Sequence, residues 1–310
     1  MNNIVMKTIV PIILLMGAGF FSRNRGILKP GDERVLSGYV YYFALPALFL
    51  VNMSETDFTG ETLRFILAGI IPVFVMLIIF IVIYFIFRLS RNTLYLLILS
   101  TIFGSTAFFG IPFVMFAFPT RQGEHLAILS AASISIVGVT ISILVLELYR
   151  LEQSTIWEGV KRLAKRLSRN PLIISILCGI LLSLMGIKIP SPLSTSLHML
   201  GGTTATVAIF MLGVFLYGRR YTNIAQAFKL SLLRILFLPT VALLTTKFFM
   251  LPKMENSILV LMHGMPVAIS MIILSERYDF YKETIASLIL ISSLAAGLYL
   301  NLWLMVLGHH

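Results

Sequence analysis

The sequence predicts an all-α integral membrane protein, and three observations agree on this fold class. Hydrophobic residues make up 58% of the 310-residue chain, charged residues only 12%, and the mean hydropathy is +0.95. A soluble domain needs more charged residues than this to cover its surface. Apolar runs long enough to cross a hydrocarbon core also recur along the whole chain and leave no stretch for a soluble domain.

Ten apolar runs predict ten transmembrane helices. Their approximate ranges are residues 2–21, 34–53, 62–87, 93–118, 124–148, 171–187, 194–217, 224–248, 256–276 and 283–307. The first run is similar to the others and lacks a small-residue cleavage site, so we expect a retained helix rather than a signal peptide.

The fourth and ninth predicted helices each contain a Gly-x-Pro sequence, at Gly110–Pro112 and Gly264–Pro266. A proline removes a backbone donor and frees the carbonyl a turn before it, and lipid supplies no water to satisfy that group. Two such breaks at corresponding places in two halves of a chain indicate a transporter's substrate site. The alternative is that each proline only kinks its helix; the matched pair favours the site.

Basic residues are distributed unequally between the two sides of these helices. Loops on one side carry 17 of the 24 Lys and Arg residues, those on the other side carry 6, and Arg234 lies within the eighth helix. The richer side is expected to be cytoplasmic, which makes both termini extracellular. The net charge of +11 then reflects topology and contact with anionic lipid rather than nucleic-acid binding, because the basic residues adjoin membrane spans.

The longest loop divides the chain into a first set of five helices (1–149), a linker (150–170) and a second set of five (171–310). Apolar residues of the linker alternate at helical spacing with basic ones, which predicts an amphipathic helix at the lipid surface on the cytoplasmic side. A regulatory segment and a plain linker both fit this pattern. Because five is odd, the second set enters the membrane from the opposite side, and the two halves are predicted to be inverted repeats.

Several short motifs, in this order and spacing, resemble the auxin efflux carrier family of plant and prokaryotic membrane transporters. The segment Phe103–Pro112 looks like the family's G-N-T-G-x-x-G-I-P sequence. The other matching segments are Asn170–Ile173, Met211–Gly213, Met265–Ala268 and Glu276–Tyr278. The resemblance covers essentially the full length of the chain.

The resemblance implies a fold like that of the bile acid/sodium symporters, with two inverted five-helix repeats and crossing broken helices 4 and 9. Helices 1, 2, 6 and 7 would form a scaffold, and helices 3–5 and 8–10 a transport domain. It also implies a homodimer in the plasma membrane that carries small organic anions, such as carboxylates, by an elevator-like movement.

Two positions depart from the family pattern. The asparagine that contacts the substrate carboxylate in plant members would fall at Ser105, and an asparagine frequent in bacterial members falls at Ser270. A hydroxyl donates one hydrogen bond but cannot replace the two donors of an amide. The motifs therefore leave the identity of the substrate open.

The candidate substrate-binding residues lie at or near the predicted breaks. Ser105 and Thr106 precede the first break; they either contact the substrate or serve as small packing residues between helices. Ser270 and the break residues of Gly110–Pro112 and Gly264–Pro266 complete this set.

Two ionisable residues are predicted inside the membrane. His263 directly precedes the second break; it either binds an anion or a proton, or is a neutral side chain bonded to a freed carbonyl. Arg234 lies about 15 Å along its helix, too deep to reach the surface easily. It either balances the substrate's charge or caps carbonyls of a broken helix.

Other functions have less support. The sequence shows no phosphate-binding glycine loop, no metal-ligand cluster, no nucleophile–base pair and no acidic residue in the middle of a span. We therefore expect neither an enzyme nor a cofactor or metal. A secondary carrier of organic anions is the leading interpretation; a sodium-coupled symporter of the bile-acid type and a membrane ligand sensor that does not transport are the alternatives.

The charge bias makes a direct prediction about topology. A reporter fused within residues 150–170 should be cytoplasmic and a reporter at either terminus extracellular, as measured by compartment-specific activity of the fusions. Cytoplasmic termini would overturn the orientation.

Overall fold

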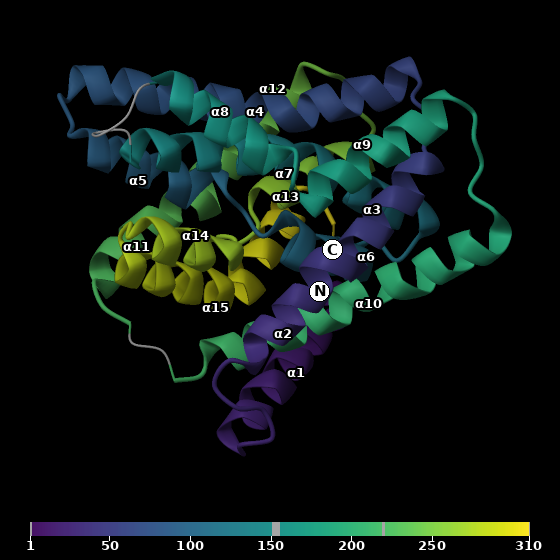
Figure 1. The fold of residues 1–310 in the computed structure, drawn as a ribbon, viewed down its shortest axis with the longest axis horizontal. Coiled ribbons are helices and arrows are strands. Elements are labelled where there is room, and N and C mark those ends of the chain that lie inside the picture. The colour runs from purple at the N-terminus through teal and green to yellow at the C-terminus, as the bar shows by residue number, and fades with distance from the viewer. Residues whose placement is uncertain (1, 151–155, 219–220, 310) are drawn as a thin grey trace.

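A computed structural model describes residues 2–150, 156–218 and 221–309. Over these ranges every regular element is a helix (Figure 1). In chain order they are α1 (Asn2–Asn24), α2 (Asp32–Tyr39), η1 (Val40–Ala44), α3 (Leu45–Ser54), α4 (Gly60–Ile86), α5 (Arg91–Ile102), η2 (Thr106–Gly110), α6 (Ile111–Ala117), α7 (Arg121–Arg150), α8 (Ile156–Leu167), α9 (Pro171–Leu184), α10 (Ser191–Leu216), α11 (Ile224–Leu232), η4 (Leu233–Phe237), α12 (Leu238–Lys247), α13 (Lys253–His263), α14 (Ser270–Tyr278) and α15 (Lys282–Val306), where η marks a π-helix.

The all-α membrane class is confirmed by the length and composition of these helices. In the described ranges, six continuous helical stretches are long and apolar enough to cross a membrane: Asp32–Ser54, Gly60–Ile86, Arg121–Arg150, Ser191–Leu216, Ile224–Lys247 and Lys282–Val306. Shorter apolar helices cover Val10–Asn24, Thr106–Ala117 and Pro171–Leu184. The total of ten spans stays a prediction.

Three prolines each follow a π-helix directly. Pro46, Pro112 and Pro239 lie in the first turn of the α-helix that continues from η1, η2 or η4. In each case the residue before the proline donates its N–H to the carbonyl five residues earlier. A wider turn here avoids the clash between the proline ring and the preceding turn, so the helix continues without a gap.

The position predicted for the first break is therefore wrong. The chain runs helically through Gly110 and Pro112, because the π-turn of η2 absorbs the effect of the proline. The non-helical stretch is Phe103–Ser105, between α5 and η2. In the second half the prediction agrees with the structure: α13 ends at His263, and α14 begins only at Ser270.

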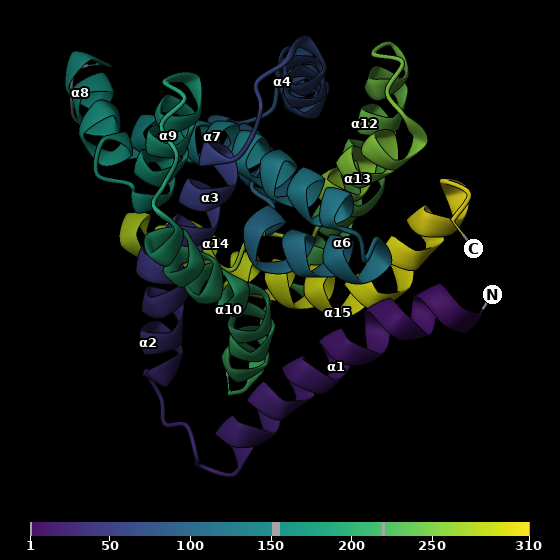
Figure 2. The same cartoon turned by 90° about the vertical axis from the view of Figure 1, so that its right-hand side faces the viewer.

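The helices pack in two groups. In one, α1 packs on α10, and α3 packs on α9 and α10; these elements lie on the right and lower side of Figure 1. In the other, α4 packs on α7 and α12, α12 on α13, and α11 on α15. In Figure 2 the start of α1 and the end of α15 lie on the same side of the molecule, and α8 lies on the opposite side.

Glycines allow α1 and α10 to approach closely. A Cβ built on Gly213 of α10 would overlap the carbonyl oxygen of Met16 in α1, and one on Gly19 would overlap the carbonyl of Phe210. Small residues at helix contacts stabilise membrane proteins because they bring whole backbones into van der Waals contact.

This contact predicts a large difference between two substitutions in the same helix. Gly213→Ala should lower the stability of the purified protein by about 1–3 kcal/mol, the usual cost of overpacking. Gly202→Ala is the control, because nothing lies within 4 Å of its added Cβ. Equal thermal melting of the two variants would show that the backbones of α1 and α10 do not approach this closely.

Candidate functional site

The two non-helical stretches cross and pair through their backbones. The amide of Ser105 donates to the carbonyl of Pro266 at 2.7 Å, and the amide of Ala268 donates to the carbonyl of Phe103 at 3.0 Å. The residues between them, Gly104 and Val267, form an isolated antiparallel bridge. Each break thus satisfies part of the other's backbone, as a buried break in a membrane requires.

Arg234 binds the carbonyl groups that the breaks leave open. Its side chain is fully buried in η4. Nε donates to the carbonyl of Met265 at 2.7 Å, and Nη1 donates to those of Thr101 and Ile102 at 2.5 and 3.2 Å. Thr101 and Ile102 end α5, so a guanidinium compensates the partial negative charge of this helix end.

Gly104 is required for this arrangement. A Cβ at this position would overlap the Nη2 and Cζ atoms of Arg234. Nη2 itself has no hydrogen-bond partner in the described part of the chain. Arg234 therefore caps carbonyls of the broken helices, as one of the two alternatives expected. Its Nη2 nitrogen remains available to donate.

The start of η2 supplies further donors. Within the described residues, no hydrogen bond involves the amides of Thr106, Ala107 or Phe108, and the buried hydroxyl of Ser105 has no partner either. The amides of Ile269 and Ser270, at the start of α14, likewise have no hydrogen-bond acceptor among the described residues. First-turn amides and the positive end of a helix dipole form a favourable environment for an anion.

His263 has one ring nitrogen occupied and one open. Nε2 lies 2.8 Å from the carbonyl oxygen of Gly69 in α4, and it must donate because a carbonyl only accepts. Nδ1 is buried and lacks a partner among the described side chains and backbone. The bond to a carbonyl expected as one alternative is present, but the carbonyl belongs to Gly69 within α4 and not to the second break.

The remaining predicted residues divide between the crossing and its surroundings. Thr106 forms a hydrogen bond with Ser135 of α7 at 2.8 Å, a helix-packing contact. Pro266 contributes the carbonyl bonded to Ser105, and Gly264 terminates α13. Gly110 packs against Met262, and Pro112 lies beyond it in α6, so these two residues are outside the crossing itself.

Helix α15 contributes residues that the sequence did not single out. Ser292 accepts a hydrogen bond from the amide of Val267 at 3.2 Å, and Trp303 donates to the carbonyl of Ile235 beside Arg234 at 2.9 Å. Tyr299 is buried and its hydroxyl has no described partner. Ser292 and Tyr299 are seven residues apart, hence on one helix face, and this spacing of polar groups was the available signal.

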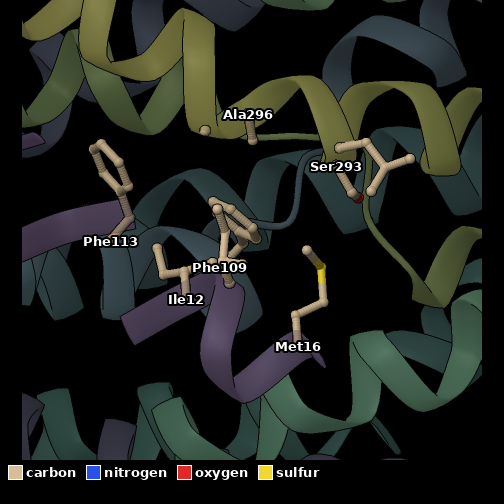
Figure 3. Close-up of a pocket in the computed structure, with 9 residues that line it drawn as sticks. Ile12, Met16, Phe109, Phe113, Ser293 and Ala296 are labelled. Atoms are coloured by element: carbon tan, nitrogen blue, oxygen red, sulfur yellow. The ribbon is translucent and has the colours of Figure 1, made fainter. Parts of the chain in front are cut away.

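A small cavity of about 40 Å³ lies beside the crossing helices (Figure 3). Ile12 and Met16 of α1 face Phe109 and Phe113 across it, and α15 closes it with Ser293, Leu294, Ala296 and Gly297. Cavities that hold small organic ligands measure roughly 300–1,000 Å³, so this one is too small for such a ligand in the conformation seen here.

These features define a class: a multi-pass helical membrane protein in which two interrupted helices cross. The chain belongs to the auxin efflux carrier family, since the family model described as "Membrane transport protein" matches residues 4–304. The uncharacterized transporter MJ1031 of Methanocaldococcus jannaschii is 25% identical over 97% of this chain and 98% of its own length. The uncharacterized transporter YfdV of Escherichia coli K12 is 25% identical over 96% of both chains.

The contacts of Arg234 predict a large effect on stability. Arg234→Gln should destabilise the protein by at least about 3 kcal/mol, because three buried carbonyls lose a charged donor at roughly 1–3 kcal/mol each. Arg64→Gln, which removes an exposed arginine at the start of α4, is the matched control. If both variants melt like the parent protein, the guanidinium does not hold the break in place.

Proposed function

We propose that this protein is a secondary carrier of small organic anions, carboxylates in particular. The observation that supports the proposal most strongly is the group of unoccupied donors at the crossing. The amides that begin η2 and the Ser105 hydroxyl are consecutive in the chain, and Nη2 of Arg234 lies against Gly104, directly before them. A carboxylate is acceptor-only when ionised, so it complements such a set.

For the architecture, we propose ten transmembrane helices in two inverted repeats, 1–149 and 171–310. Three observations support this. Each half contains one interrupted helix, between α5 and η2 in the first and between α13 and α14 in the second; the two interruptions meet in an antiparallel bridge; and the linker helix α8 lies on the side opposite the termini (Figure 2). Because α8 and the termini lie on opposite sides and the linker side is the richer in basic residues, we also propose extracellular termini and a cytoplasmic linker in the plasma membrane.

For the mechanism, we propose elevator-like alternating access in a homodimer. The scaffold comprises α1–α3, α9 and α10, whose mutual packing is described above, and the remaining helices carry the crossing. The cavity of Figure 3 lies between α1 of the scaffold and the helices η2, α6 and α15. The boundary is incompletely packed at this place. Incomplete packing would let the crossing slide past α1 as a rigid unit.

Transport of a carboxylate is the direct test, after a thermal-shift screen of organic acids identifies a ligand that raises the melting temperature. In proteoliposomes we expect uptake of this ligand without a sodium gradient. Uptake that requires the gradient would favour the sodium-coupled symporter, and binding without any uptake would favour the ligand sensor.

The Ser105 hydroxyl provides a test at the level of one residue. Ser105→Ala should weaken binding of the identified carboxylate about tenfold or more, because a hydrogen bond to a charged group contributes roughly 1.5–3 kcal/mol. Ser142→Ala is the control; the Ser142 hydroxyl is equally buried but donates to the Gly138 carbonyl within α7. Equal affinities in the two variants would place the ligand away from the crossing.

A further inference from the structure

A second charged cluster lies at the end of α7, away from the crossing. Glu147 is buried and contacts three side chains of other helices, one through a hydrogen bond and two as ion pairs. The Tyr278 hydroxyl of α14 donates to it at 2.6 Å, and Arg162 and Arg166 of α8 lie 3.2 and 3.0 Å from its oxygens. One carboxylate therefore joins α7, α8 and α14.

Among the side chains that the structure describes here, positive charge exceeds negative charge. Arg150 at the end of α7 and Arg277 at the end of α14 both interact electrostatically with Arg166, and both are exposed. Among the described side chains, two arginines thus pair with Glu147 and two more lie near Arg166. Burial lowers the pKa of Arg166. The nearby charge of Glu147 opposes this shift, whereas the charges of Arg277, Arg150 and Arg162 add to it.

The Arg166 side chain is also fixed in orientation. Its guanidinium carbon lies 4.9 Å from the centre of the Tyr278 ring, in a cation–π contact. A guanidinium held over an aromatic ring keeps N–H groups that match the oxygens of a phosphate group.

We propose that these arginines bind the phosphate of an anionic phospholipid headgroup. The lipid is the expected source of the phosphate because the cluster lies where membrane helices α7 and α14 end and an amphipathic helix begins. Three more exposed basic residues extend the positive surface around the cluster: Lys161 and Lys165 of α8, and Arg169 just after its end. Clusters of basic residues at the ends of membrane helices bind anionic headgroups.

Such a site connects the lipid to the crossing. Helix α14 begins at Ser270, directly after the second break, and carries Tyr278 at its other end. A headgroup bound by Arg277 and Arg150 bridges α14 to α7 in addition to the bond through Glu147.

The test is a lipid titration of the purified full-length protein in detergent, followed by thermal melting. Phosphatidylglycerol should raise the melting temperature of the parent protein, whereas phosphatidylcholine and inorganic phosphate at the same concentration should not.

Arg150→Gln and Arg277→Gln should each raise the half-saturating phosphatidylglycerol concentration about fivefold, which corresponds to about 1 kcal/mol per basic side chain near an anionic surface. Neither residue is among those that contact Glu147, so melting without lipid should remain near that of the parent.

The matched controls are Arg25→Gln and Arg34→Gln, which remove exposed arginines near the turn between α1 and α2. They should leave the titration unchanged. The proposal is overturned if the control and test variants shift the titration equally, or if phosphatidylcholine protects as well as phosphatidylglycerol. Equal protection by inorganic phosphate would overturn the lipid as the occupant.

Discussion

The structure depends on one constraint: inside a membrane, every backbone group of a broken helix must find its partner within the protein. The two breaks satisfy this requirement largely through each other, by the paired hydrogen bonds between Ser105 and Pro266 and between Ala268 and Phe103. Arg234 satisfies the carbonyl side, with three bonds to the carbonyls of Thr101, Ile102 and Met265. Its approach is possible only because residue 104 has no side chain.

This arrangement also determines which backbone groups remain without a hydrogen-bond partner. Carbonyls at the crossing accept hydrogen bonds from Arg234 and from the opposite non-helical segment. The first amides of η2 and α14, in contrast, donate to no acceptor among the described residues. An excess of donors in a buried place favours an anion over a cation. The same guanidinium therefore serves two purposes: it stabilises the break and adds positive charge where we propose that the anion binds.

The sequence was sufficient for the membrane class and for the second break, since Gly264 and Pro266 mark a helix end that no wider turn repairs. It misplaced the first break, because a proline indicates a lost donor but not whether a π-turn such as η2 absorbs the loss. Arg234 was recognised as deep and charged, yet its partners come from distant segments of the chain. Ser292 and Tyr299 could not be assigned, since their roles depend on how α15 packs against the crossing. Glu147 likewise has no signal apart from its position near a helix end.

The central claim is that the crossing, rather than the cavity beside α1, binds the transported anion. The most direct measurement is an experimental structure of the protein with a carboxylate that raises its melting temperature. We predict carboxylate density within hydrogen-bond distance of the Thr106–Phe108 amides and the Ser105 hydroxyl, with Nη2 of Arg234 turned toward it. Carboxylate density lined by Ile12, Met16 and Phe113 instead, with the η2 amides still unoccupied, would contradict it.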